Sequence, residues 1–209
     1  MTEPCRALRG LLEAVVREYR RILGRNLAGI YLHGSAAFGC FRWQTSDIDL
    51  LVAVHAPPSS RQKEGLVRTL LAQGTAAPPA GFEMSVVLVR YCRQFVWPVP
   101  YELHFSNMHR ASFEKDLSAA CARIHGTDKD LAAHFAVTRA AGVTLWGESP
   151  RTMFCAIPPG AYKAAILYDA ATAVQDAGPK PVQVVLNLCR ALAFWRQGLV
   201  LSKQQGGQW

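Results

Sequence analysis

The sequence predicts an α+β protein, in which a mixed β-sheet with flanking helices comes first and an all-helical region follows. Two observations support this order. Short apolar runs of strand length occur in the first half of the chain, whereas Ala- and Leu-rich segments with helical spacing dominate from about residue 128 onward. We therefore expect a sheet domain over residues 1–115 and a helical domain over residues 125–209, with the boundary between about 112 and 127.

The first half alternates between helical and strand patterns. Apolar residues at three- and four-residue spacing predict an amphipathic helix over residues 5–24, which Gly24 would end. Continuous or alternating apolar runs predict strands, and a shorter leucine-rich face predicts a second helix. The expected strands cover residues 28–33, 48–55, 83–91 and 101–105, and the second helix covers residues 63–73.

The second half contains three segments with helical spacing, at residues 128–141, 161–176 and 181–197. Asp128 is suited to cap the first of them, because aspartate side chains accept hydrogen bonds from free backbone N–H groups at a helix start. Pro181 suits the first turn of the third, where its missing N–H costs nothing. We therefore expect a helical bundle here.

The composition is that of a globular protein with a basic surface. Half of the 209 residues are apolar, and 23 Lys and Arg against 15 Asp and Glu give a net charge of +8. A basic surface favours polyanions such as a nucleoside triphosphate. Nucleic acid is not an expected partner, because the arginines are scattered and form no Lys/Arg run.

No targeting or membrane segment is evident in the sequence. A membrane span needs about 20 apolar residues, and the N-terminal segment is charged throughout, unlike a secretory signal. The six cysteines have no CxxC or zinc-type spacing, so we expect reduced thiols. Together these features predict a cytoplasmic protein.

Two carboxylates one residue apart stand at the start of the second expected strand. Side chains at positions i and i+2 of a strand share a face, so Asp47 and Asp49 point the same way. A cation between them relieves their repulsion, and Mg²⁺ prefers carboxylate and phosphate oxygens. Glu83 opens the next strand in the same setting. If the two strands are neighbours, Glu83 either completes the metal site or acts as a general base on a hydroxyl.

Gly34 and Ser35 follow the first expected strand. A turn of small residues lets backbone N–H groups and the serine hydroxyl approach phosphate oxygens. Taken singly these features are common, since an SDID segment is often a polar strand entry and a glutamate at a strand end is usually solvated. The ordered set of strand, Gly-Ser, Asp-x-Asp, strand and Glu-led strand favours a magnesium nucleotide site.

The set G-S-x(10)-S-D-I-D-L, followed by a Glu-led strand, resembles the nucleotidyltransferase superfamily. Within it, the chain is similar to the aminoglycoside nucleotidyltransferases of the streptomycin/spectinomycin adenylyltransferase family, over roughly residues 28–209. The closer resemblance lies in WPVPYELHF (97–105), DKDLAAHFAVTRAAGVTLWGES (128–149), VVLNLCRALAFWRQG (184–198) and LVLSK (199–203).

The resemblance implies an ATP- and Mg²⁺-dependent enzyme of antibiotic resistance, with a nucleotidyltransferase-type sheet domain. It would transfer an adenylyl group to a hydroxyl of an aminoglycoside or aminocyclitol and release pyrophosphate. The implied metal-binding and catalytic residues are Asp47, Asp49 and Glu83, with Glu83 as the base. The implied triphosphate-binding residues are Gly34, Ser35, Ser46, Arg190 and Lys203, the last two from the helical domain.

Two positions depart from the family pattern. Met108 stands where a tryptophan is usual and Lys180 where an acidic residue is usual, which leaves Glu102 and Asp176 as candidate partners for the drug. Family members continue into further helices, so the helical domain is expected to be truncated relative to the family. Separately, the protein is expected to be a monomer. The alternatives are nucleotidyl transfer to RNA or protein, and a truncated inactive remnant.

Overall fold

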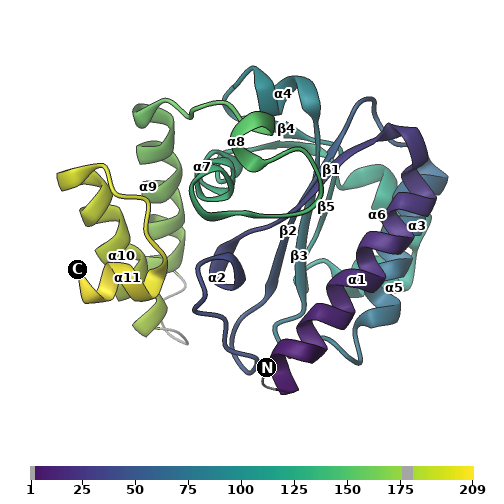
Figure 1. Cartoon of the computed structure of the whole chain (residues 1–209), viewed down its shortest axis with the longest axis horizontal. Helices are drawn as coiled ribbons and strands as arrows, with labels where there is room; N and C mark the ends of the chain where they lie inside the picture. The colour runs from purple at the N-terminus through teal and green to yellow at the C-terminus, as the bar shows by residue number, and fades with distance from the viewer. Residues whose placement is uncertain (1–2, 176–180) are drawn as a thin grey trace.

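A mixed five-stranded sheet forms the centre of the computed structural model, which describes residues 3–175 and 181–209 (Figure 1). The strand order is β5-β3-β2-β1-β7. Strands β2 and β3 run parallel, and the other neighbours run antiparallel. The strands are β1 (Leu27–Leu32), β2 (Ile48–Val54), β3 (Phe82–Leu88), β5 (Leu103–Phe105) and β7 (Val143–Gly147).

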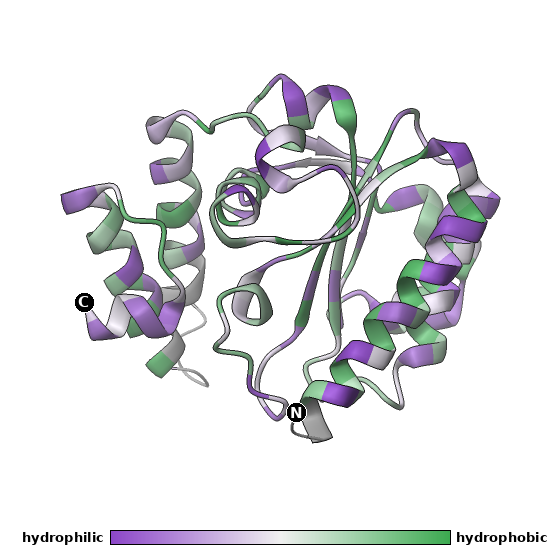
Figure 2. Cartoon of the chain, in the orientation of Figure 1, coloured by the Kyte–Doolittle hydropathy of each residue, from purple (hydrophilic) through white to green (hydrophobic). Residues whose placement is uncertain are grey.

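Helices cover both faces of this sheet. Because side chains alternate along a strand, Leu50 and Val52 of β2 pack on one side, and Leu51 and Ala53 pack on the other. The first side is covered by α1 (Glu3–Leu23), α3 (Ser60–Gln73), α5 (Arg110–Lys115) and α6 (Leu117–Arg123). The second is covered by α4 (Val89–Arg93), α7 (Leu131–Ala141) and α8 (Pro150–Met153). Figure 2 shows hydrophobic and hydrophilic residues alternating along α1, as an amphipathic surface helix requires.

Short elements connect the two layers. The 3₁₀ helix η1 (Gly24–Asn26) joins α1 to β1, and α2 (Gly34–Ala37) follows β1 directly. Strands β4 (Val99–Tyr101) and β6 (Gly126–Asp128) pair antiparallel as a separate two-stranded sheet, which leads the chain into α7.

Three helices follow the sheet domain, at the left of Figure 1. They are α9 (Pro159–Gln175), α10 (Pro181–Gln197) and α11 (Lys203–Gln208). Ala132 and Ala133 of α7 pack against Tyr162, Ala165 and Ile166 of α9, so α7 joins the sheet to these helices. No helix within residues 3–175 and 181–209 combines the length and apolarity needed to cross a bilayer.

The predicted fold class is confirmed, with three corrections to its elements. The strand expected over residues 83–91 ends at Leu88, and Val89 begins α4. The region after residue 125 is not wholly helical, because β6 and β7 lie within it and β7 pairs with β1. The expected strand over residues 101–105 is divided between two sheets, since Tyr101 ends β4 and Leu103 begins β5. The division of the chain into domains over residues 1–115 and 125–209 stays a prediction.

Candidate active site

The structure brings Asp47, Asp49 and Glu83 together on the α7 side of the sheet. Strands β2 and β3 are parallel neighbours, and their register sets Asp49 directly beside Glu83. One carboxylate oxygen from each of the three residues lies within 4.8 Å of the others. In residues 3–175 and 181–209, this is the one such group of three potential metal ligands. Three carboxylate oxygens form a donor set that suits Mg²⁺.

Burial and neighbouring carboxylates raise the pKa of both Asp49 and Glu83. Desolvation, followed by the charges of Asp47 and Glu83, raises the pKa of Asp49 well above its usual range. Desolvation also raises the pKa of Glu83, although His134 opposes the shift. The charged forms of Asp49 and Glu83 are therefore energetically unfavourable, and a bound cation would stabilise them.

The Gly34–Ser35 turn lies directly against this cluster. The backbone N–H of His33 donates to the carbonyl oxygen of Asp49 at 3.0 Å, which ties the turn to β2. The Oγ of Ser35 is buried and has no hydrogen-bond partner among the described residues. A buried hydroxyl without a hydrogen-bond partner destabilises the folded state, and a bound phosphate oxygen could accept a hydrogen bond from this one. Ser46 accepts a hydrogen bond from the backbone N–H of Arg42 at 3.0 Å, which closes the loop before Asp47.

Replacing Gly34 with alanine should disable the site more than it destabilises the fold. Gly34 has a φ of +59°, and a Cβ atom there would overlap the Asp49 carboxylate. The backbone strain costs about 1 kcal/mol, and displacing a reacting group by about 1 Å can cost about 10²-fold in rate. We expect Gly34→Ala to lower kcat for nucleotidyl transfer by about that factor, as measured by steady-state kinetics.

Gly39 offers the matched control. It also has a positive φ, +73°, but a Cβ atom there would meet nothing within 4 Å. Gly39→Ala therefore introduces comparable backbone strain without the overlap. Equal losses of kcat in the two variants would contradict the role of the Gly34–Asp49 contact.

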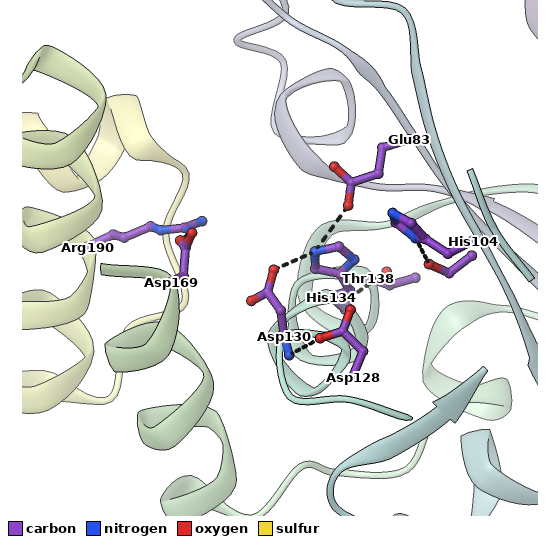
Figure 3. Close-up of polar contacts among 9 residues, drawn as sticks. Glu83, His104, Asp128, Asp130, His134, Thr138, Asp169 and Arg190 are labelled. Carbon is purple, nitrogen blue, oxygen red and sulfur yellow. Dashed lines mark hydrogen bonds and ion pairs between the residues drawn. The ribbon is translucent and has the colours of Figure 1, made fainter. Parts of the chain in front are cut away.

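Sequence reasoning missed His134, which the structure places between Asp130 and Glu83 (Figure 3). Its Nε2 lies 3.1 Å from Oδ2 of Asp130 and 3.8 Å from Oε1 of Glu83. Burial alone would lower the pKa of His134, but the charge and hydrogen bond of Asp130, together with Glu83, raise it to about 10. Asp130 and His134 stand at positions i and i+4 of the chain, and this spacing was the available sequence signal.

The expected cap of α7 also differs. The side chain of Asp128 accepts a hydrogen bond from the backbone N–H of Asp130 at 2.8 Å, but Asp130 is the residue at the helix start. Asp128 thus fixes the segment that carries Asp130 and does not cap α7 itself.

Arg190 and Lys203 supply positive charge from the C-terminal helices. Arg190 of α10 donates from Nη2 to Oδ2 of Asp169 on α9 at 2.6 Å. Figure 3 shows this pair on the side of the view opposite Glu83 and His134. The charge of Arg190 helps to lower the pKa of Asp130, and the charge of Lys203 opposes the rise in the pKa of Asp49. The charge of Arg190 therefore reaches Asp130, and the charge of Lys203 reaches Asp49 of the acidic cluster.

Glu102 and Asp176 do not join the site in the described structure. The Glu102 carboxylate lies 3.9 Å from Nζ of Lys63 on α3, the helix that covers the opposite face of the sheet. Asp176 lies outside the described residues. Met108 is highly exposed at the surface.

Comparison with known proteins shows which proteins the chain is similar to. A family profile described as "Aminoglycoside adenylyltransferase, C-terminal domain" matches residues 152–209. Spectinomycin 9-adenylyltransferases from Staphylococcus aureus strains Mu50 and N315 are each 24% identical over 200 residues, which span 90% of this chain and 72% of the relative. The chain is thus similar to aminoglycoside adenylyltransferases, both over its C-terminal residues 152–209 and over most of its length. The resemblance inferred from the sequence is thereby confirmed.

The fold of the chain also has a solved counterpart. A crystal structure of spectinomycin adenyltransferase AAD(9) from "Enterococcus faecialis", described with ATP and spectinomycin, matches with a TM-score of 0.80 at 18% identity. The match covers 95% of this chain and 80% of that one. Likeness at this identity shows the shared fold, a nucleotidyltransferase-type sheet domain followed by helices.

Proposed function

We propose that the chain transfers the adenylyl group of ATP to a hydroxyl of an aminocyclitol or aminoglycoside antibiotic and releases pyrophosphate. The observation that carries this proposal is the cluster of Asp47, Asp49 and Glu83. The match of the C-terminal residues to the adenylyltransferase profile and the names of the similar proteins support an antibiotic as the acceptor. Spectinomycin is therefore the first substrate to test.

The acidic cluster fits a magnesium ion bound to a triphosphate. Asp47 and Asp49 would hold the ion, which would neutralise charge on the phosphate oxygens. Ser35 would donate its hydroxyl, which has no partner among the described residues, to a phosphate oxygen. Ser46 completes the loop beside Asp47. Arg190 and Lys203 add positive charge from the helices.

Glu83 is suited to take the proton of the acceptor hydroxyl. Desolvation raises the pKa of Glu83, which makes its carboxylate a stronger base than an exposed glutamate. As the proton moves to Glu83, the hydroxyl oxygen forms a bond to the α-phosphorus of ATP. The bond from that phosphorus to the β-phosphate oxygen breaks, and pyrophosphate leaves with the electron pair.

The deciding experiment measures pyrophosphate release by the purified chain with ATP and MgCl₂. Spectinomycin, streptomycin and other aminoglycosides are added one at a time, and Asp47→Asn serves as the inactive control. Release that requires both a drug and Asp47 would support the proposal. If label from α-labelled ATP instead appears on RNA or protein, the acceptor is a macromolecule. A folded chain that neither binds ATP nor releases pyrophosphate would be a remnant without activity.

Arg190 should matter for ATP affinity in particular. A charge-assisted hydrogen bond is worth about 1.5–3 kcal/mol, which corresponds to about 10–100-fold. We expect Arg190→Gln to raise KM for ATP by about 10-fold or more, as measured by initial rates at saturating drug. Arg196→Gln is the matched control, because Arg196 is exposed on the same helix. Equal values of KM for the parent and Arg190→Gln would rule out the phosphate contact.

A further inference from the structure

We propose that His134 is a positioning residue that holds the Glu83 carboxylate in place for the reaction. The inference rests on the proposed function, in which Glu83 is the base. It assigns a role to a residue of α7 that stands outside the Gly-Ser and Asp-x-Asp motifs.

The contacts of Nε2 define this role. The nitrogen lies between two carboxylates, 3.1 Å from Asp130 and 3.8 Å from Glu83 (Figure 3). The shorter contact is a hydrogen bond, and the longer one lies within ion-pair distance but beyond hydrogen-bond distance. Nε2 carries a single hydrogen, so the two carboxylates share one N–H group, which lies closer to Asp130.

Glu83 has few other restraints. In residues 3–175 and 181–209, its carboxylate has no hydrogen-bond or ion-pair partner besides His134. A glutamate side chain has three rotatable bonds, and fixing it without a partner would cost conformational entropy. A base must lie within hydrogen-bond reach of the proton it accepts, so its orientation bears directly on the rate.

His134 itself is firmly held. Its side chain is 19% exposed, and its ring packs against His33 with centroids 4.9 Å apart. The neighbouring residue Phe135 anchors α7 in the core against the sheet. Behind the ring, Asp128 fixes the segment of Asp130 through a 2.8 Å hydrogen bond. Because α7 is fixed against the sheet, His134 is fixed as well, and its contact restricts where the Glu83 carboxylate can lie. The ring of His33 also connects His134 to the Gly34–Ser35 turn.

Two substitutions separate positioning from packing. His134→Gln keeps an N–H donor near the place of Nε2, whereas His134→Leu fills a similar volume without any donor. We expect His134→Leu to lower kcat by about 10–100-fold with KM for ATP changed less than about 3-fold, because losing a positioning contact displaces the base. His134→Gln should recover most of kcat. Thermal unfolding with and without MgCl₂ checks that each variant folds and that the metal site is intact.

Asp130→Asn provides a second test that leaves the imidazole in place. Because Asp130 acts through His134, Asp130→Asn should lower kcat in the parent but have little further effect in a His134→Leu background. If His134→Leu does not fold, Asp130→Asn can be combined with His134→Gln instead. The kcat of this double variant should then be no lower than that of the slower single variant.

The outcomes that overturn the inference are distinct from failure of the proposed function. Unchanged kcat in folded His134→Leu, equal loss in the Gln and Leu variants, or fully additive effects of Asp130→Asn would overturn the role of His134 alone. If the parent chain shows no drug-dependent pyrophosphate release, the proposed function fails and this inference fails with it.

Discussion

The Asp49→Asn variant is expected to transfer almost no adenylyl group and yet to unfold at a higher temperature than the parent chain when magnesium is absent. The loss of activity should be at least about 10³-fold, because a catalytic metal contributes several kcal/mol of charge stabilisation in the transition state. The gain in stability follows from the electrostatics of the cluster, in which desolvation and two neighbouring carboxylates penalise the charged form of Asp49. We expect about 1 kcal/mol, or about 2–4 °C in Tm for a chain of this size.

The stability gain of Asp49→Asn should depend on pH, and the raised pKa of Asp49 sets the direction of this dependence. The folded chain holds the Asp49 proton more tightly than the unfolded chain does, because the pKa of Asp49 is raised on folding. The favourable contribution of the protonated group is complete below its unfolded pKa of about 4, and it is lost as the pH rises through the raised pKa. The advantage of Asp49→Asn should therefore be largest at neutral pH and should shrink toward pH 4. Differential scanning fluorimetry across this pH range measures it.

Two further measurements sharpen this test. MgCl₂ should raise the Tm of the parent chain more than that of Asp49→Asn, because a ligand stabilises the state that binds it. Asp47→Asn should also lose transfer, but with little change in folding stability. A Tm of metal-free Asp49→Asn below that of the parent chain at neutral pH would contradict the view that the charge of Asp49 destabilises the fold.

The sheet could be predicted from the sequence wherever a strand is buried on both faces. Strands β1, β2 and β3 are continuous apolar runs because helices cover both sides of the sheet. Strand β7 was not recognisable in this way. It lies at the edge of the sheet, its residues Val143 and Trp146 are exposed, and Arg20 of α1 covers the Trp146 ring at 3.6 Å. Its place depends on tertiary packing that no local pattern records.

Some residues of the candidate site could likewise be predicted from the sequence, and others could not. Asp47 and Asp49 could be placed together because side chains alternate along a strand, and Glu83 joined them on the condition that the two strands are neighbours, as β2 and β3 are. Arg190 and Lys203 were reached only through the family resemblance, since nothing in their local sequence points to a phosphate. His134 was missed because a single histidine on an Ala-rich helix resembles an ordinary core residue. Its relation to Glu83 arises only when α7 folds back across β3.

Glu83→Gln should lower kcat by about 10²–10⁴-fold, the range typical for removing a general base. Glutamine keeps the size of the side chain but cannot accept the hydroxyl proton. If Glu83 acts as the base, KM for ATP and the Tm shift caused by MgCl₂ should both stay close to the parent values. Steady-state kinetics and thermal unfolding measure these quantities. Glu148→Gln is a matched control, because Glu148 lies in an exposed ion pair with Arg93.

The same variant also decides between the two roles that the sequence left open for Glu83. Its oxygen lies within 4.8 Å of those of Asp47 and Asp49, so geometry alone permits a metal ligand as well as a base. A lost ligand weakens metal binding, and raising the MgCl₂ concentration would then restore much of kcat. A lost base leaves metal binding intact, and no concentration of MgCl₂ would restore the rate. Because desolvation raises the pKa of Glu83 and His134 anchors its carboxylate, we expect the second result.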